Sequence, residues 1–455
     1  MGDVVNEPRN ALGNEDGALR PPLDVAIVGG GLVGVIAALG LVHRGIRVTV
    51  YERGAKFQEL GAGIGFPRVA RECMQRMDPR VLDALARVTQ QNPHDTVRYW
   101  DGFNPRTKES SELKEGALLF DVPERDLAFW SCLRSHFLLE MVALLPEGVT
   151  QFGKRLVEYI DEEKSDKVVL RFADGSRAEA DVVIGCDGIH STTRKLLLGA
   201  DHPASHPTYS HKKIFRGLAP INAVANALGV DKAHDYIMHL GPNAHTLSFP
   251  VNNGTLGYML FAIHDADEWA DPHTMTAPST RDQVARAFQS WGPHIVEAVS
   301  LLPEKLDMYG VFDMADHPAP IYAAGRVCIA GDAAHASSPF HGVGAGMGIE
   351  DALVLVELLA QVRDQNEAGA GAGPPALTAA LKTFSTVRME RTHWLVQSSR
   401  DMGNIYQWRY PDTGRDSAKI KAEFERRARK IWDFDVDGMV ADAKKEYGKR
   451  RAGEL

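Results

Sequence analysis

Glycines at fixed spacing, with an acidic residue about 20 positions further on, form the first group of residues that could do chemistry. Gly29-x-Gly31-x-x-Gly34 follows the apolar run VAIV, and Glu52 ends the next apolar run, with Arg53 after it. Such glycines let the backbone approach a pyrophosphate, while the following helix N-terminus favours its charge. A carboxylate at the end of the second strand can hold a ribose diol. This pattern predicts a dinucleotide site, without separating FAD from NAD.

A second candidate site lies far downstream, in the segment CIAGDAAHASSPFHGVGAGMGIEDALVL that starts at Cys328. Asp332 follows an apolar run, and small residues then lead into a helix expected to begin near Val343. A carboxylate at a strand end can bind a ribityl hydroxyl, and a glycine-rich helix start can offer N–H groups to a ring or phosphate. Two such sites suit a long, two-ended cofactor such as FAD. A tight strand-to-helix turn with glycines for packing is the alternative.

A third segment, CDGIHSTTR at 186–194, again follows a buried apolar run. In order and spacing, GGGLVG, CDGIHSTTR and AGDAAHASSP resemble the motifs of group A flavoprotein monooxygenases, the single-component aromatic hydroxylases such as salicylate and para-hydroxybenzoate hydroxylases. YSHKKIFRGL, HLGPNAHTLSFPV and KIWDFDVDGMV extend a closer resemblance to fungal phenol hydroxylases of polyketide pathways. Those enzymes act on resorcylic aldehydes or ketones and can dearomatise the ring.

The resemblance implies the cofactors and the residues that bind them. FAD would be reduced by NADPH or NADH, and a flavin C4a-hydroperoxide formed with O2 would hydroxylate an electron-rich phenol. The glycines of the first turn would hold the pyrophosphate, and Glu52 the adenosine ribose. The other implied cofactor-binding residues are Arg53, Arg134, Asp187, Asp332, Gly342, Val343, Gly344 and Ala345. Arg194 belongs to the third motif, and a surface helix cation is its alternative interpretation.

Three further residues are candidate catalytic groups. Arg216 stands in the apolar run IFRGLAP, where an unpaired guanidinium is costly, so we expect it to stabilise a phenolate. Packing on an aromatic ring or pairing with a carboxylate is the alternative for Arg216. His341 is expected where flavin and substrate meet, or else as a cap of the next helix. Strand alternation places His245 and Phe249 on one face.

The predicted substrate pocket contains Arg216, Tyr236, Phe249 and Pro339. Dearomatising relatives can carry a tyrosine where Phe249 stands, and phenylalanine cannot donate a hydrogen bond to a substrate oxygen. Tyr236 or Tyr322 could replace that donor.

Segment 24–53 reads as strand, helix and strand, and segment 150–185 reads as a hairpin followed by a buried strand. Residues 60–150 read as mainly helical, with polar loops near 90–115. We expect an α/β fold: a discontinuous Rossmann-like FAD-binding domain with a parallel sheet (24–200 and 316–365) and an inserted, mostly antiparallel substrate domain (201–315). A disordered tail (1–23), a flexible loop (366–376) and C-terminal helices (377–455) complete the prediction.

Composition narrows the function classes. The 455 residues carry a formal charge of -9, which argues against nucleic-acid binding. No apolar run approaches the roughly 20 residues of a membrane span, no h-region of a signal peptide is present, and the four cysteines form no metal motif. We therefore expect a cytoplasmic enzyme, monomeric or homodimeric, with a small phenolic substrate and no metal. The leading function is dearomatising hydroxylation of a phenolic polyketide. Alternatives are salicylate-type hydroxylation, an NAD-dependent dehydrogenase and an FAD-stabilised interaction protein.

Overall fold

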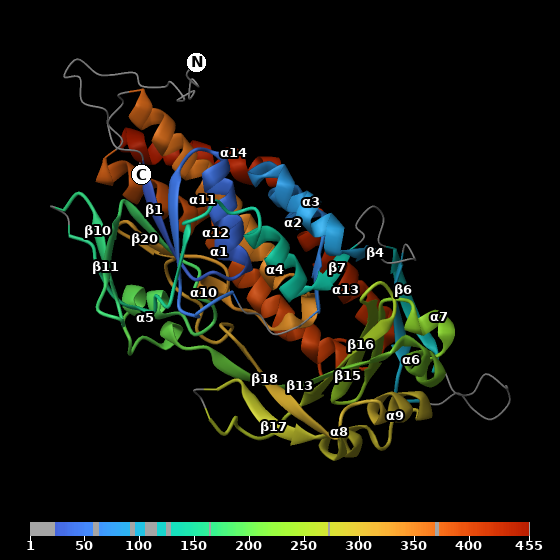
Figure 1. Ribbon diagram of the computed structural model, residues 1–455. Coiled ribbons are helices and arrows are strands. Elements are labelled where there is room, and N and C mark those ends of the chain that lie inside the picture. Colours follow the sequence, from blue (N-terminus) through green and yellow to red (C-terminus); the bar gives the residue numbers. More distant parts are fainter. Residues whose placement is uncertain are drawn as a thin grey trace, which may run out of the picture.

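The structure is a computed structural model that describes residues 23–57, 63–91, 96–104, 116–123, 129–162, 165–271, 274–368 and 373–454. The predicted tail, apart from Leu23, lies outside the described residues, and so does the centre of the predicted loop at 366–376. Figure 1 shows two main sheets joined by long helices.

The first sheet has six strands in the order β19-β20-β12-β1-β2-β8. All neighbours are parallel except β19 and β20, which confirms the predicted parallel sheet. Its central strands are apolar on both faces because both faces are covered. The strands are β1 (Asp24–Val28), β2 (Arg47–Glu52), β8 (Thr150–Phe152), β12 (Val182–Gly185), β19 (Ala323–Ala324) and β20 (Val327–Ile329).

Alternate residues of this sheet face two different layers. Val25 and Ile27 belong to a large core with α1 (Leu32–His43), α11 (Gly344–Glu367) and neighbouring helices. Ala26 and Val28 instead pack on a small antiparallel sheet, which lies on the opposite side in Figure 1. That sheet contains β9 (Leu156–Ile160), β10 (Val168–Phe172) and β11 (Arg177–Ala180), and the hairpin predicted near 150–185 is β10–β11.

The second main sheet has eight strands in the order β17-β18-β13-β16-β15-β14-β5-β6, antiparallel except where β14 pairs with β5. It includes the predicted insert: β13 (Thr208–Pro220), β14 (Ile237–Gly241), β15 (Ala244–Val251), β16 (Leu256–His264), β17 (Thr276–Thr280) and β18 (Lys305–Asp313). Helices α6 (Ile221–Leu228), α7 (Val230–Ala233), α8 (Arg281–Phe288) and α9 (Pro293–Ser300) accompany it.

Two strands of this sheet come from a region that we expected to be mainly helical and part of the FAD-binding domain. β5 (Thr96–Asp101) and β6 (Leu118–Pro123) pair with each other, and β5 joins β14. β5 lies where we expected a polar loop and β6 where we expected helix, so the prediction was wrong at both; the residue-by-residue alternation of burial in β5 is that of a strand. The substrate-side sheet is thus built from two separate parts of the chain.

Helices and a second small sheet connect the two main sheets. The second small sheet contains β3 (Gly63–Phe66), β4 (Gln90–Gln91) and β7 (Trp130–Leu133). The helices are α2 (Arg68–Met77), α3 (Pro79–Val88), α4 (Arg134–Val142), α5 (Thr192–Leu198), α10 (Asp332–His335), α12 (Pro374–Tyr406), α13 (Ser417–Trp432) and α14 (Val436–Ala452), with short 3-10 turns at Pro203–Ser205 and Pro339–His341. The first half of α12 packs in the large core, and its second half packs with α13 against the eight-stranded sheet. None of the helices within these described ranges combines the length and apolar character that a bilayer span requires.

A buried histidine between the eight-stranded sheet and α9 should make the free energy of unfolding depend on pH. His239 of β14 is fully buried, with its ring 5.2 Å from that of His294 in α9. Burial, and then the charges of His294 and Lys232, hold the pKa of His239 well below its ordinary 6.5.

We therefore expect the free energy of unfolding to fall as the pH drops below 6.5. There the unfolded chain binds a proton at His239 that the folded chain does not, at a cost of about 1.4 kcal/mol per pH unit. Urea unfolding of His239→Gln between pH 7.5 and 5 should give a shallower pH slope than the wild type, whereas the exposed His317→Gln should keep the wild-type slope. Equal slopes for His239→Gln and the wild type would contradict this assignment.

Candidate active site

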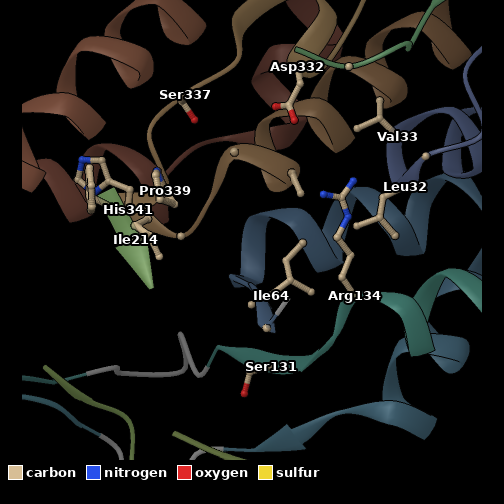
Figure 2. A pocket seen from close by; sticks show the side chains of 18 of the residues that line it. Leu32, Val33, Ile64, Ser131, Arg134, Ile214, Asp332, Ser337, Pro339 and His341 are labelled. Atoms are coloured by element: carbon tan, nitrogen blue, oxygen red, sulfur yellow. The ribbon is translucent and has the colours of Figure 1, made fainter. Parts of the chain in front are cut away.

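A single cavity of about 560 Å³ reaches from the turn after β1 to the inner face of the eight-stranded sheet. Gly29 and Asp332, which head the two predicted cofactor turns, both line this cavity although 303 positions separate them in the chain, counted from 29 to 332. In Figure 2 Asp332 and Leu32 lie on one side of it, while Pro339, His341 and Ile214 lie together further along. The two turns therefore share one ligand-sized space, within the range of small-molecule sites.

The glycine turn has the geometry of a phosphate cradle. Gly29 has a φ of +107°, and a Cβ there would overlap the Cys186 carbonyl, which belongs to the third motif. A Cβ on Gly34 would overlap the Gly29 carbonyl, so glycine is what lets α1 lie against the turn. At Gly31 the space is open, since the nearest atom to a Cβ is Arg134 Nη2 at 4.0 Å. The cradle therefore faces the cavity with backbone and a guanidinium, the groups that a pyrophosphate requires.

Glu52 lies at the same end of the cavity as three cationic side chains. Its carboxylate accepts hydrogen bonds from the N–H groups of Gly30, at 2.8 Å, and Gly54, at 2.7 Å. Arg53, Lys154 and Arg155 also line this end. Two backbone donors thus hold the carboxylate in place beside the cavity, where the predicted ribose contact would be made.

The Asp332 turn is held from behind by the third motif. Arg194, which we considered as a surface cation, is fully buried and donates hydrogen bonds to the carbonyls of Asp332, at 3.3 Å, and Ala333, at 3.0 Å. The carboxylate of Asp187 accepts hydrogen bonds from the Thr193 N–H and the Ser191 hydroxyl at the start of α5. Arg194 is therefore an internal support of the turn, and Asp187 lines the cavity while it caps α5.

The Asp332 side chain itself is exposed on the cavity wall. Its carboxylate has no hydrogen-bond partner among the described residues, so it is available to a ligand. The available carboxylate, the glycine cradle and the shared cavity match the polar groups that FAD presents along its length. FAD would be held by these residues and by Arg134, with Gly342, Gly344 and Ala345 lining the space beyond Asp332.

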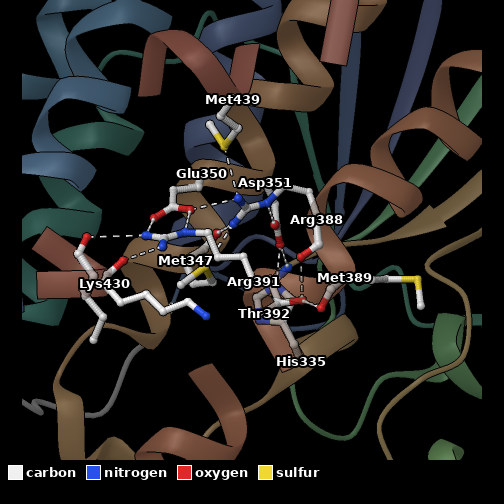
Figure 3. Close-up of polar contacts among 12 residues, drawn as sticks. His335, Met347, Glu350, Asp351, Arg388, Met389, Arg391, Thr392, Lys430 and Met439 are labelled. Atoms are coloured by element: carbon white, nitrogen blue, oxygen red, sulfur yellow. Dashed lines mark hydrogen bonds and ion pairs between the residues drawn. The ribbon is translucent and has the colours of Figure 1, made fainter. Parts of the chain in front are cut away.

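A network of buried charges, drawn in Figure 3, underlies this turn. Asp351 of α11 accepts hydrogen bonds from the Gly331 N–H at 3.0 Å, from His335 and from Arg388 Nε at 2.7 Å. Arg388 of α12 also contacts Glu350, which forms a two-point ion pair with Arg391. Burial alone would raise the pKa of Asp351, but His335 and Arg388 outweigh it and hold that pKa below its ordinary value.

The other end of the cavity is apolar and aromatic. Tyr236 stacks on Phe249 at 5.3 Å between ring centroids, and Phe249 packs on Tyr258 at 4.9 Å. His245 and His341 also line this end. Burial, and then the charge of Lys212, lowers the pKa of His245 to about 3, while burial and then Arg427 lower the pKa of His341 to about 3. Both imidazoles are thus neutral hydrogen-bonding groups at ordinary pH.

Four predicted residues lie away from the cavity wall. Arg216 is not among the lining residues: its guanidinium packs over the Tyr309 ring at 3.7 Å, and its charge acts on Tyr258, whose pKa it lowers against the larger effect of burial. The aromatic-packing alternative therefore describes Arg216 better than direct contact with a phenolate. Gly34 acts by packing and Val343 is buried behind the wall. Tyr322, a possible substitute for the missing tyrosine, is buried against Thr392.

Several residues that line the cavity were not predicted from the sequence. They come from β5, β16 and the C-terminal helices, and include Tyr99, Tyr258, Tyr406, Phe424, Ile431 and Trp432. The segment KIWDFDVDGMV, which contains the last two, contributed to the resemblance without a stated role. The alternation in β5 could have indicated Tyr99, but only the packing of α12 and α13 on the sheet brings the others to the cavity.

Comparison with known proteins agrees with this geometry. The family described as FAD binding domain matches residues 22–371. An FAD-dependent monooxygenase from Aspergillus terreus is 61% identical over 433 residues, covering 94% of this chain and 98% of the relative. A salicylate hydroxylase from Sarocladium schorii is 42% identical, covering 96% and 94%. Among solved structures, a salicylate hydroxylase–substrate complex has a TM-score of 0.79 at 29% identity, covering 93% of this chain and 98% of that one.

The fold and the cavity define a flavin-binding oxidoreductase. The chain belongs to the FAD binding domain family, as a monooxygenase of the salicylate hydroxylase-like group. The predicted fold class and enzyme class are therefore confirmed, and the alternative of an NAD-dependent dehydrogenase is wrong.

Removal of the Asp332 carboxylate should weaken FAD binding while the fold is kept. Loss of a hydrogen bond to a charged group costs about 1.5–3 kcal/mol, so we expect the Kd of FAD to rise roughly tenfold to hundredfold in Asp332→Ala. Flavin absorbance after gel filtration, followed by titration with FAD, measures the change. Asp412→Ala, exposed between α12 and α13, is the control. An Asp332→Ala protein that stays fully yellow would show that this carboxylate does not hold the cofactor.

Proposed function

We propose that the chain hydroxylates, and thereby dearomatises, a phenolic polyketide such as an alkylated resorcylic aldehyde or ketone, with NADPH or NADH as reductant. The bound flavin supplies the redox chemistry, by taking hydride from the nicotinamide and transferring one oxygen atom of O2 to an electron-rich ring. The protein binds and orients the phenol, excludes water and keeps the ring end of the cavity neutral.

The observation that carries this proposal is the division of one cavity into a charged end, lined by cations and carboxylates, and a neutral, aromatic end. The lining cations Arg53, Lys154 and Arg155 flank Glu52 at the nucleotide end. Among the described residues, the eight-stranded sheet and the helices α12 and α13 contribute no lysine or arginine to the wall. A flat apolar ring with hydroxyl and carbonyl oxygens suits aromatic walls that carry a few polar groups.

Salicylate-type hydroxylation is the second candidate, and the names of the Sarocladium relative and of the solved hydroxylase favour it. A carboxylate substrate loses its hydration on entering an apolar site and calls for a cation there. The nearest candidate, Arg216, faces Tyr309 and Tyr258 instead of the cavity. We therefore favour a substrate without a carboxylate.

The polar groups at the aromatic end indicate how a phenol would be oriented. Tyr258 lines the cavity, where its hydroxyl can donate a hydrogen bond to a ligand oxygen, and the positive charge of Arg216 acts on the same phenol group. Burial raises the pKa of Tyr258 against the opposing effect of Arg216, so the hydroxyl stays protonated at ordinary pH. Phe249 lies between Tyr236 and Tyr258 and contributes an apolar surface.

A comparison of substrates tests the proposed function. A 2,4-dihydroxybenzaldehyde with an alkyl substituent should accelerate NADPH or NADH oxidation by the FAD-bound enzyme, whereas salicylate should not. The product should be heavier by one oxygen atom, chiral, and without the aromatic absorbance of the substrate. Salicylate turnover together with an inert resorcylaldehyde would establish the second candidate in place of the first.

Arg216 and Tyr258 should act as one unit. We expect Arg216→Ala and Tyr258→Phe each to retain FAD and to lower kcat/KM about tenfold, because each removes one member of an interacting pair beside the ligand. The double variant should lose little more than either single one, since coupled residues are not additive. Leu218→Ala, exposed on the same strand, is the control. Additive losses, with Arg216→Ala much the more severe, would instead indicate direct phenolate binding by Arg216.

A further inference from the structure

His341 is connected to the C-terminal helices by a chain of side chains that the proposed function does not use. Its Nε2 lies 2.9 Å from the Ser398 hydroxyl of α12. Ser398 is 1% exposed, and its oxygen accepts a hydrogen bond from Arg427 Nη1 of α13, also at 2.9 Å. The imidazole stacks on Trp394 of α12, which limits the rotation of the ring.

The hydrogen-bonding capacity of each group determines where the protons lie in the series Arg427, Ser398 and His341. A guanidinium only donates, so Arg427 occupies a lone pair of Ser398 Oγ. The Ser398 O–H has no acceptor among the described residues other than His341 Nε2. If Nε2 carried the proton, the serine O–H would be buried without a partner, at a cost of about 1–3 kcal/mol. Nε2 is therefore the acceptor, and the imidazole proton is on Nδ1.

Burial, and then the charge of Arg427, keep the His341 imidazole neutral by lowering its pKa. Arg427 is 4% exposed and is held by Glu423, at 3.0 Å, and Asp401, at 3.1 Å, so its guanidinium has a fixed position. Lys430 of the same helix lies over the Trp394 ring at 4.4 Å. Protonation of His341 would place a charge in a buried position next to a fixed guanidinium, which disfavours it.

We propose that Ser398 and Arg427 are positioning residues that hold His341 as a neutral Nδ1–H donor facing the cavity. His341 lines the cavity, and its Nδ1 has no acceptor in the described part of the chain. That N–H is thus reserved for the ligand, and it stabilises an oxygen that gains negative charge there without adding a titrating cation. The proposal rests on the proposed function only for the identity of this ligand.

The tautomer can be measured directly on the FAD-bound enzyme by nuclear magnetic resonance of protein labelled with 15N-histidine. The signal of His341 is identified by its loss in His341→Gln. In the wild type we expect the pattern of a neutral Nδ1–H imidazole, unchanged from pH 8 to 5.5. Ser398→Ala removes the donor to Nε2, so its signal should shift to that of a mixture of both tautomers. Ser398→Thr keeps the hydroxyl and should keep the wild-type pattern.

The neighbouring Ser399→Ala is the matched control, because Ser399 is equally buried and has no contact with His341. Arg427→Met provides a second test: the released Ser398 oxygen can then accept a hydrogen bond from an Nε2–H group, so the tautomer preference should weaken. Far-UV circular dichroism and FAD content verify that each variant is folded and loaded. An Nε2–H pattern or a titration near pH 6.5 in the wild type, or an unchanged pattern in Ser398→Ala, would overturn the proposal. A wild type without FAD would refute the proposed function, yet the tautomer would still be measurable.

Discussion

The contact on which the cofactor end of the molecule depends is the carboxylate of Asp351. One of its oxygens binds the Gly331 N–H and His335, on both sides of Asp332, and the other binds Arg388 of α12. Asp351 thus joins the Asp332 turn, its own helix α11 and helix α12 at one buried position. A charge at such a site persists only when it is fully partnered, and removing one partner costs about 3–5 kcal/mol. The Asp332 turn is therefore kept in one position relative to the glycine turn on the other side of the cavity.

Two cores with different roles meet along α12. Its first half packs with the parallel sheet, whose carboxyl edge forms the polar end of the cavity. Its second half packs with α13 against the eight-stranded sheet and closes the aromatic end. The buried Arg388 and Arg391 lie near the middle of this helix, so one helix carries both a side chain that supports the cofactor turn and side chains that shape the aromatic end.

The electrostatics of the two ends follow from this arrangement. Cations stand where a pyrophosphate and adenosine would lie, and the aromatic end has neutral donors in place of charges. His245 and His341 stay neutral because burial and nearby cations lower the pKa of each to about 3. Lys212 and Arg427, the cations responsible, lie behind the wall, where they act on the imidazoles without meeting the ligand.

Local patterns determined much of the fold and the cofactor half of the site. The glycine spacing, Glu52 and the Asp332 turn were readable because backbone geometry at a turn restricts the residues that can occupy it, and such restrictions are visible over a few positions. The continuous apolar strands likewise predicted the parallel sheet.

The tertiary structure alone decided the substrate half. Strand alternation places Arg216 on a face but does not tell which face meets the cavity, so its position over Tyr309 depends on the neighbouring strands. The burial of Arg194 beneath Asp332, and the meeting of His341 with Ser398 and Arg427, join residues 138, 57 and 29 positions apart. Contacts of this kind arise from the packing of whole elements, which no local run of residues specifies.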